Sequence, residues 1–574
     1  MSSLGPLRVR WLGRVRYQDA HALQHALFRR SGDDHLLLME HPHVYTLGVR
    51  ARPEHVLADP GEVGADLVRA DRGGDVTYHG PGQLVGYPIL SIPMGPGAVP
   101  RYVHSLEQLV AEALADVGLP GAGPLDGYPG VWVDPGGADP RKICAVGVRV
   151  SRGRTMHGFA LNVAPDLSMF EHIVPCGIHD RSVTSLEAEG VRATVRDVAD
   201  AVVARAAEVL VFGPRSTLRR IERQDVPSAD HRRRTAPVEP VASSGTPAVV
   251  PVALSAGARP LERRLAAAGV DPAAGVAISE RKPDWLRVRA EMGGSYLSLR
   301  RTMRELKLVT VCEEAGCPNV YECWADGTAT FMINGERCTR ACGFCLVDTR
   351  HPLPLDPDEP DHVAEAVERM GLAHAVVTAV ARDDLPDGGA AAFAATIAAV
   401  RVRRPDTTVE VLIPDCKGDP AALQTIFDAA PDVLNHNLET VLRLQRAVRP
   451  SASYARSLSV LGRAKAAGLT TKSGIILGMG EREDEVLGAL ADLAGVGVDI
   501  VTLGQYLRPS TTQLPVDRWW APEEFGRLRA AALAMGFGHV EASPLTRSSY
   551  HARQAAESNT RRAGNGRAEA AGPA

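Results

Sequence analysis

The chain has 574 residues, 45% of them hydrophobic and 23% charged, and its formal net charge at pH 7 is −4. This ordinary composition indicates a globular protein, and the length favours more than one domain. The small net charge excludes the footprint of a nucleic-acid-binding protein, no apolar run approaches the ~18 residues of a membrane span, and the first 20 residues lack the apolar stretch of an export signal. We therefore expect a cytoplasmic protein that binds neither nucleic acid nor membrane.

Residues 1–222 have the pattern of one compact α/β domain. A helix is expected over 193–210, where apolar residues recur every three or four positions, and a glycine-rich loop over 72–82 (RGGDVTYHGPG). Strands are expected at 36–39, 131–133, 143–150 and 158–163.

Two residues of this domain are candidates for chemistry. Cys176 lies in the sequence HIVPCG, and Lys142 lies in RKIC. A lone cysteine is more often a small core residue, and a lone lysine is more often solvated. Cys144 is the rival nucleophile, because in a strand it shares a face with Lys142.

The motifs around these residues resemble those of the lipoyl-carrier octanoyltransferases, over nearly all of 1–215. The resemblance rests on the loop at 72–82, GVWV at 130–133, Lys142, GFA at 158–160, PCG at 175–177 and VTSL at 183–186. It implies the α/β acyltransferase fold of the biotin and lipoate protein ligases. It also implies that Cys176 takes octanoyl from octanoyl-acyl carrier protein as a thioester and passes it to a lysine of a lipoyl domain. Lys142 would favour the thiolate of Cys176 and accept the proton of the incoming amine.

The same resemblance implies an acyl-binding pocket. Backbone amides of 72–79 and 145–147 would hold the acyl carbonyl, where glycines permit a close approach. His79 would shape the pocket or would only pack. The alternative is a lipoate-protein ligase, which shares the fold but consumes ATP. The implied substrate-binding residues are Arg72, Gly73, Gly74, Asp75, Val76, Thr77, Tyr78, His79, Ala145, Val146, Gly147, Gly158, Phe159 and Ala160.

Residues 223–255 are rich in Pro, Ser, Ala and Gly and predict a flexible linker. The second domain is expected over 256–556, followed by a disordered tail over 557–574. Its apolar strands alternate with helical stretches, which is typical of a parallel barrel whose chemistry lies at the C-terminal ends of the strands. Six repeats predict an open, partial (β/α)6 barrel, with strands at 329–333, 375–380, 409–413, 433–437, 474–477 and 501–506.

Six cysteines precede and follow the first of these strands. Cys312, Cys317 and Cys323 have the spacing C-x4-C-x5-C, and Cys338, Cys342 and Cys345 have the spacing C-x3-C-x2-C. Three thiolates at short spacing can hold three corners of a cubane iron–sulfur cluster. Disulfides are disfavoured in a reducing compartment, and structural zinc usually takes four protein ligands.

The second triplet, in CTRACGFC, resembles the loop of radical S-adenosylmethionine (SAM) enzymes, and the upstream triplet narrows the match to the lipoyl synthases. The resemblance covers about 281–555 and includes RDDLPDGG (382–389), VLIPD (411–415), NHNLET (435–440), TKSG (471–474) and RSSY (547–550). It implies two 4Fe–4S clusters, one that binds SAM on Cys338, Cys342 and Cys345 and one auxiliary cluster on Cys312, Cys317 and Cys323. Ser549 would be the fourth auxiliary ligand, with Ser548 as the alternative, so RSSY must fold back onto the first triplet.

This family inserts two sulfur atoms, at carbons six and eight of the octanoyl chain. Phe344, 471–474, Gly478 and Gly480 are expected near SAM, and Gln513 stands where the family usually has histidine. A fusion of both steps of lipoate assembly is therefore expected. Its partners would be lipoyl domains of 2-oxoacid dehydrogenase complexes, the glycine cleavage H protein, and an electron donor such as ferredoxin or flavodoxin. The alternatives are a different radical SAM sulfur inserter and a non-enzymatic iron–sulfur carrier.

Overall fold

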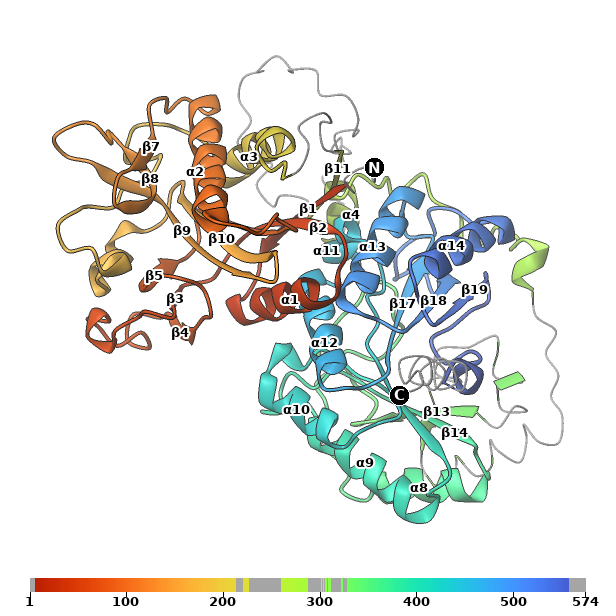
Figure 1. The fold of residues 1–574 in the computed structure, drawn as a ribbon. Coiled ribbons are helices and arrows are strands. Elements are labelled where there is room, and N and C mark those ends of the chain that lie inside the picture. Colours follow the sequence, from red (N-terminus) through yellow and green to blue (C-terminus); the bar gives the residue numbers. More distant parts are fainter. Residues whose placement is uncertain are drawn as a thin grey trace, which may run out of the picture. The chain divides into compact units, whose positions relative to one another are not determined.

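The computed structural model describes residues 6–212, 220–226, 260–287 and 328–556, with isolated positions between 301 and 323. The chain divides into two compact units, Met1–Ser228 (the first unit) and Ala229–Ala574 (the second unit). Each unit is an α/β structure built around its own sheet (Figure 1).

The first unit contains an eight-stranded mixed sheet in the order β11-β1-β2-β6-β10-β9-β8-β7 and a three-stranded sheet in the order β4-β3-β5. The strands of the larger sheet are β1 (Leu7–Arg14), β2 (Asp34–Glu40), β6 (Gln83–Ile89), β7 (Gly123–Leu125), β8 (Tyr128–Val133), β9 (Arg141–Ser151), β10 (Arg154–Asn162) and β11 (Ile221–Asp225). Those of the smaller sheet are β3 (Val44–Leu47), β4 (Asp66–Arg69) and β5 (Val76–His79).

Three α-helices complete the first unit: α1 (Tyr17–Arg30), α2 (Ala98–Asp116) and α3 (Val195–Val209). The last begins at a capping box, in which Thr194 and Asp197 satisfy each other's backbone N–H groups. Helices α2 and α3 bury their apolar faces with the large sheet in one core, whereas α1 lies against β6 and β10. Short 3-10 turns at Pro53–His55, Leu167–His172 and Pro175–Gly177 lie in the connecting loops.

All four strands and the helix expected in this unit are present. Two features differ from the expectation. The glycine-rich segment contains a strand, β5, because residues 76–79 pair with β3. Residues 223–225, expected in the linker, belong to β11, which pairs with β1 in parallel. Residues 227–255 of the expected linker lie outside the described residues.

The second unit is an eight-stranded sheet in which chain order and sheet order coincide, from β12 to β19. Strand β12 (Val309–Thr310) is antiparallel to its neighbour, and the other seven are parallel. They are β13 (Thr328–Ile333), β14 (His374–Ala379), β15 (Thr408–Leu412), β16 (Val433–Asn435), β17 (Thr471–Leu477), β18 (Ile500–Gln505) and β19 (His539–Ala542). All six expected strands are confirmed, and the partial barrel has a seventh, β19.

The helices of the second unit connect successive strands (Figure 1). They are α8 (Glu359–Arg369), α9 (Ala390–Arg403), α10 (Pro420–Asp428), α11 (Gln445–Val448), α12 (Tyr454–Ala466), α13 (Glu483–Val496) and α14 (Pro522–Ala534), with α4 (Pro260–Ala267) ahead of the barrel. Apolar residues of α8, α9 and α10 share one core with β13, β14 and β15. The loop after β13 carries Cys338, Cys342 and Cys345, and the loop after β14 carries RDDLPDGG.

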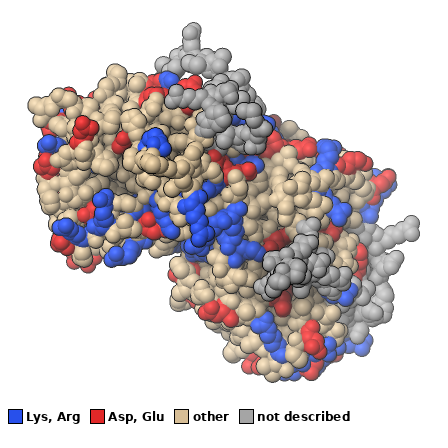
Figure 2. All heavy atoms as spheres, viewed as in Figure 1, with Lys and Arg blue, Asp and Glu red and all other residues tan. Residues whose placement is uncertain are grey.

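Basic and acidic side chains are both spread over the visible face of each unit (Figure 2). Among the described residues, no helix has the length and apolar character needed to cross a membrane. The tail at 557–574 lies outside the described residues.

Candidate functional site

A cavity of about 450 Å³ opens in the first unit beside strands β9 and β10. Cys176 and Lys142 both line it. All the predicted substrate-binding residues except Val76 and Tyr78 line it as well. These two alternate with Thr77 and His79 along β5, so their side chains point away from the cavity into an apolar cluster with Tyr45 and Phe170.

Lys142 is buried at the start of β9, with 6% of its surface exposed. Its Nζ lies 4.8 Å from the centre of the Trp132 ring, which faces the ammonium group. The backbone is fixed from the other side, because Lys142 N donates to Ser182 O at 2.9 Å and Thr184 N donates to Lys142 O at 2.9 Å. The VTSL motif therefore holds the lysine strand in position.

Cys144 is not placed for nucleophilic chemistry. The pairing of β8 with β9 shifts between Val131 and Trp132, so Ile143 is an extra residue and the side chains of Lys142 and Cys144 do not share a face as expected. Cys144 is fully buried in the core, and burial raises the pKa of its thiol. The structure thus places Cys176, and not Cys144, at the cavity.

Cys176 occupies a tight turn at the edge of the cavity. It is half-buried and has φ of 57°, a left-handed conformation that costs energy for any residue with a side chain. The turn is tied to a neighbouring loop by the Val174 N to His55 O hydrogen bond of 2.8 Å. A Cβ added at Gly177 would come within 3.0 Å of the Asp75 carboxylate, so this glycine permits the close approach.

Arg72 and Asp75 shape the glycine-rich segment from within. The buried Arg72 guanidinium donates to Asp75 O at 2.8 Å and to Gly73 O at 3.1 Å. Burial lowers the pKa of Arg72, and the facing Tyr17 and Cys176 oppose that shift. The Asp75 carboxylate lies 2.6 Å from His55 Nδ1 and accepts from Val76 N at 2.7 Å. Both charged side chains therefore order the loop that faces the cavity.

Eleven lining residues are absent from the sequence prediction, among them Tyr17, Tyr87 and His157. His157 directly precedes the GFA motif, so its place beside that motif could have identified it as a lining residue. It has φ of 58°, and burial lowers its pKa to about 4 although Asp71 acts against the shift. Tyr17 and Tyr87 come from α1 and β6, and nothing local in their sequence marks them.

The predicted pocket residue His79 is a buried, neutral imidazole. Its Nδ1 lies 2.8 Å from Gln83 Oε1, and burial lowers its pKa well below the usual value. Beside it, His41 Nδ1 lies 2.7 Å from Val15 O, and His41 Nε2 lies 2.8 Å from the Tyr87 hydroxyl. The pocket floor therefore contains stacked and edge-on rings that must stay uncharged.

His41 makes the stability of the first unit dependent on pH. Burial lowers its pKa from 6.5 to about 4, so its contribution is complete above pH 6.5 and is lost as the pH falls toward 4. We expect this residue to account for about 3 kcal/mol of the loss. Pulse proteolysis in urea, followed through fragments of residues 6–212, should give a shallower acid decline for His41→Gln. The exposed-residue control His104→Gln should keep the full decline, and equal slopes for the two variants would contradict the assignment.

In the second unit, Cys338, Cys342 and Cys345 lie in the loop after β13 and are half-buried. Cys338 Sγ accepts backbone hydrogen bonds from Ala381 N at 3.3 Å and Arg340 N at 3.4 Å. Burial raises the pKa of Cys342 to about 12, with Arg449 acting against the shift and the other two thiols adding to it. Buried thiolates held this close need a cationic group to ionise, as in an iron–sulfur cluster.

The sulfur atoms of these three cysteines do not all lie within 4.8 Å of one another. Within the described ranges, His21, His25 and Asp71 are the one group of three metal-binding side chains whose donor atoms all lie within 4.8 Å of one another. Sulfur ligands of one tetrahedral zinc ion would be about 3.8 Å apart, given bonds of ~2.3 Å. The three cysteines are therefore more widely spread than zinc requires.

The cysteine loop is anchored from several sides. Arg340 pairs with Asp383 at 2.7 Å and with the buried Asp415 at 2.6 Å. Gln513 Nε2 donates to Cys345 O at 3.1 Å. The glutamine that departs from the family pattern thus supports the cysteine loop through a neutral side-chain N–H group.

A second cavity, of about 280 Å³, lies beside Cys345 at the C-terminal ends of the strands. Phe344 and Gly474, two of the expected SAM neighbours, line it. Gly478 and Gly480 do not line it. They have φ of 111° and 114° and form the turn after β17. Lys472 also lies elsewhere, in a fully buried ion pair with Glu410 at 3.0 Å.

The RSSY segment lies beside the stretch that contains Cys323, the one described cysteine of the first triplet. The Tyr550 hydroxyl donates to the Glu322 carboxylate at 3.2 Å, and Asn319 Nδ2 donates to Leu545 O at 2.7 Å. Ser548 lines the second cavity, and its hydroxyl accepts from Asn437 Nδ2 at 2.9 Å. Cys323 is half-buried next to Glu322, whereas Cys312 and Cys317 lie outside the described residues.

Three family models match the chain: the lipoyl protein ligase A/B catalytic domain over 16–207, the N-terminal domain of lipoyl synthase of the radical SAM family over 274–317, and the radical SAM superfamily over 332–493. The chain is 55% identical over 278 residues to a lipoyl synthase of Rubrobacter xylanophilus, covering 48% of this chain and 87% of that protein. It is 55% identical over 273 residues to one of Mycobacterium leprae, again covering 48% and 87%. A bi-partite lipoate protein ligase of Thermoplasma acidophilum matches at 18% identity and a TM-score of 0.32, over 38% of this chain and 88% of that one.

Proposed function

Because the chain belongs to the lipoyl synthase family and carries a lipoyl protein ligase A/B catalytic domain ahead of that part, we propose that it performs both steps of lipoate assembly. The first unit would transfer octanoyl from octanoyl-acyl carrier protein to a lysine of a lipoyl domain. The second unit would insert sulfur at carbons six and eight of that chain. The observation that carries the proposal is that the chain has two cavities. One is lined by Cys176 and Lys142, and the other is lined by Cys345.

In the first step, Cys176 Sγ would attack the thioester carbonyl of the octanoyl carrier. The new bond joins sulfur to the acyl carbon, and the carrier thiolate leaves and takes a proton. The lysine amine of the lipoyl domain would then attack the enzyme thioester and release Cys176. Lys142 would accept the amine proton, since general bases act within hydrogen-bond reach of the proton they take. The strained turn at Cys176 supports this role, because strain of this kind clusters at functional sites.

Backbone amides of the 72–79 and 145–147 segments are proposed to hold the acyl carbonyl oxygen. Several of these amides are already engaged: Gly73 N donates to Val148 O at 3.0 Å, Val76 N donates to the Asp75 carboxylate at 2.7 Å, and residues 76–79 and 145–147 lie in paired strands. The proposed donors are therefore the amides of these segments that make no such hydrogen bond. Phe159 and Ala160 would contact the apolar acyl chain.

For the second step, membership of the radical SAM and lipoyl synthase families implies iron–sulfur and SAM chemistry, and the three thiols of the cysteine loop fit such a group. When bound, this group supplies the one-electron chemistry that removes hydrogen from unactivated carbons. Cys338, Cys342 and Cys345 would hold the cluster. Phe344, Asn437 and Gly474 would position SAM in the adjoining cavity.

We further propose a second, auxiliary 4Fe–4S cluster on Cys312, Cys317, Cys323 and Ser549, with sulfur of this cluster as the substrate of insertion. The contact of Tyr550 with Glu322 supports this, because it brings RSSY next to Cys323. Ser549 is favoured over Ser548, since the Ser548 hydroxyl is held by Asn437 in the other cavity.

We propose that the octanoyltransferase domain spans 1–222 and is extended by β11. A linker follows it, and the lipoyl synthase domain spans 256–556. A tether raises the effective concentration of one module near the other. The proposed partners are lipoyl domains of 2-oxoacid dehydrogenase complexes, the glycine cleavage H protein, and a ferredoxin or flavodoxin.

The competing function for the first unit is ATP-dependent lipoate ligation. With octanoyl-acyl carrier protein and an apo lipoyl domain, we expect octanoyl-lysine to form without ATP, because the thioester already activates the acyl group. Intact-mass spectrometry of the lipoyl domain measures this directly. Octanoyl transfer would be contradicted if modification of the lipoyl domain needed ATP and free lipoate and did not occur from the carrier thioester.

A further inference from the structure

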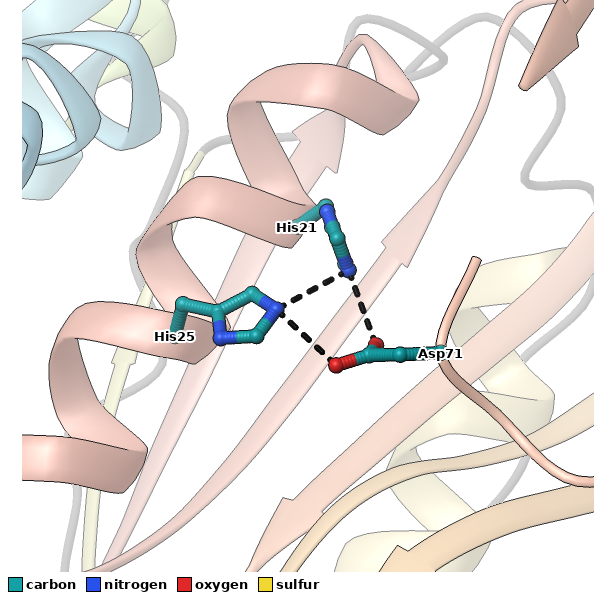
Figure 3. Close-up of side chains that lie close together, drawn as sticks. All are labelled: His21, His25 and Asp71. Carbon is teal, nitrogen blue, oxygen red and sulfur yellow. Dashed lines mark hydrogen bonds and ion pairs between the residues drawn. The ribbon is translucent and has the colours of Figure 1, made fainter. Parts of the chain in front are cut away.

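Outside the two cavities, three potential metal ligands converge in the first unit. His21 and His25 lie four positions apart on α1 and so project from one face of the helix toward Asp71, which follows β4 (Figure 3). Their side chains are partly exposed, at 24%, 21% and 30%. None of the three lines the acyl cavity or takes part in the proposed reactions.

The distances within this group match those between ligands of one small metal ion. His21 Nε2 lies 3.1 Å from Asp71 Oδ1, His25 Nε2 lies 3.2 Å from Asp71 Oδ2, and the two Nε2 atoms are 3.2 Å apart. Around a tetrahedral zinc ion with bonds of ~2.0–2.1 Å, neighbouring ligand atoms are about 3.3 Å apart. The two imidazole nitrogens and the two carboxylate oxygens therefore have separations close to those between ligands of one ion.

The chemistry of the donor atoms points the same way. The group offers two imidazole nitrogens and one carboxylate, which are donors that zinc prefers over magnesium or calcium.

Two neighbours complete the surroundings of the carboxylate. His157 Nε2 lies 2.7 Å from Asp71 Oδ1, as an orienting group does around a metal-binding carboxylate. Arg149 pairs with Asp71 Oδ2 and is the competing cation. Its side chain is 38% exposed and lies over the Phe28 ring.

We propose that His21, His25 and Asp71 bind a divalent transition-metal ion of the zinc class, with a fourth position open to water. The ion would join α1 to the segment that leads into Arg72 and the glycine-rich loop. It would lie behind the part of the cavity wall that His157 forms. This site is independent of the proposed function, since it needs neither octanoyl nor SAM.

The test uses the full chain, prepared anaerobically with its iron–sulfur content, loaded with Zn²⁺ and dialysed against metal-free buffer. Zinc and iron per chain are measured by mass spectrometry, and X-ray absorption at the zinc edge gives the ligands. We expect about one zinc per chain with a nitrogen and oxygen shell at ~2.0–2.1 Å, whereas zinc misplaced on the cysteines would have sulfur at ~2.3 Å.

The double variant His21→Ala/His25→Ala should bind zinc at least tenfold more weakly, with unchanged iron content and far-ultraviolet circular dichroism. His25→Gln, which keeps the size of the side chain, should show the same loss if the double variant does not fold. His104→Ala, an exposed histidine of α2, is the matched control and should retain zinc. A shell containing only sulfur in the parent, or equal zinc retention in the parent and His25→Gln, would overturn the site.

Discussion

Replacing Cys176 by alanine should lower octanoyl transfer by on the order of 1,000-fold or more, because the covalent intermediate has no other nucleophile to form on. Cys176 is the cysteine that lines the acyl cavity in the first unit, and its turn is strained. The measurement is the rate of octanoyl-lysine formation on a lipoyl domain. A trapped octanoyl adduct on the parent, absent from the variant by intact mass, would identify the sulfur.

Cys144→Ala is the matched control for this prediction. It removes the other thiol of the same unit, which is fully buried and whose pKa burial raises. Its transfer rate should stay within about threefold of the parent, with a small loss of stability from the cavity left behind. The assignment of Cys176 as the nucleophile would be refuted if Cys176→Ala transferred octanoyl at the parental rate. It would also be refuted if Cys144→Ala lost transfer.

The second large effect is expected from Cys342→Ala. Cubane clusters of this kind are held by three thiolates, so the loss of one corner should remove the cluster, SAM cleavage and sulfur insertion below detection. Iron should fall from about eight to about four atoms per chain, since the auxiliary cluster uses other ligands. Octanoyl transfer should persist, because the first unit has its own core and cavity.

Cys416→Ala serves as the control in the second unit. Cys416 is 5% exposed, packs in the core with α10 and β15, and has a pKa that burial raises to about 12. Iron content and sulfur insertion should therefore be retained. Full sulfur insertion by Cys342→Ala would contradict the role of the cysteine loop. Loss of iron in Cys416→Ala would show instead that iron content follows general stability.

The sequence predicted the parts whose signal is local. The six barrel strands each carry apolar residues close together in the sequence, and the structure contains all six strands. Strand β19 was not predicted, because it is an edge strand with one buried residue, Val540, and so lacks a long apolar run. Strand β5 was not predicted, because the glycines around it indicate a loop. Its strand geometry depends on pairing with β3.

The sequence predicted the site residues that belong to motifs. It did not predict those whose position depends on tertiary packing. An extra residue at Ile143 separates the faces of Lys142 and Cys144, and no sequence period reveals such a bulge. Tyr17 reaches the acyl cavity from α1, far from any motif. Gln513 replaces a histidine of the family pattern, and only the structure reveals its hydrogen bond to Cys345 O.

The central claim is that one chain makes octanoyl-lysine and converts it to lipoyl-lysine. The most direct measurement is time-resolved intact mass of an apo lipoyl domain incubated anaerobically with the purified chain, octanoyl-acyl carrier protein, SAM and a strong reductant. We expect an octanoylated species to appear first and to convert into the species with two added sulfur atoms, and to accumulate when SAM is omitted. An apo lipoyl domain that stays unmodified, or an octanoylated species that never gains sulfur although iron is fully loaded, would contradict the account.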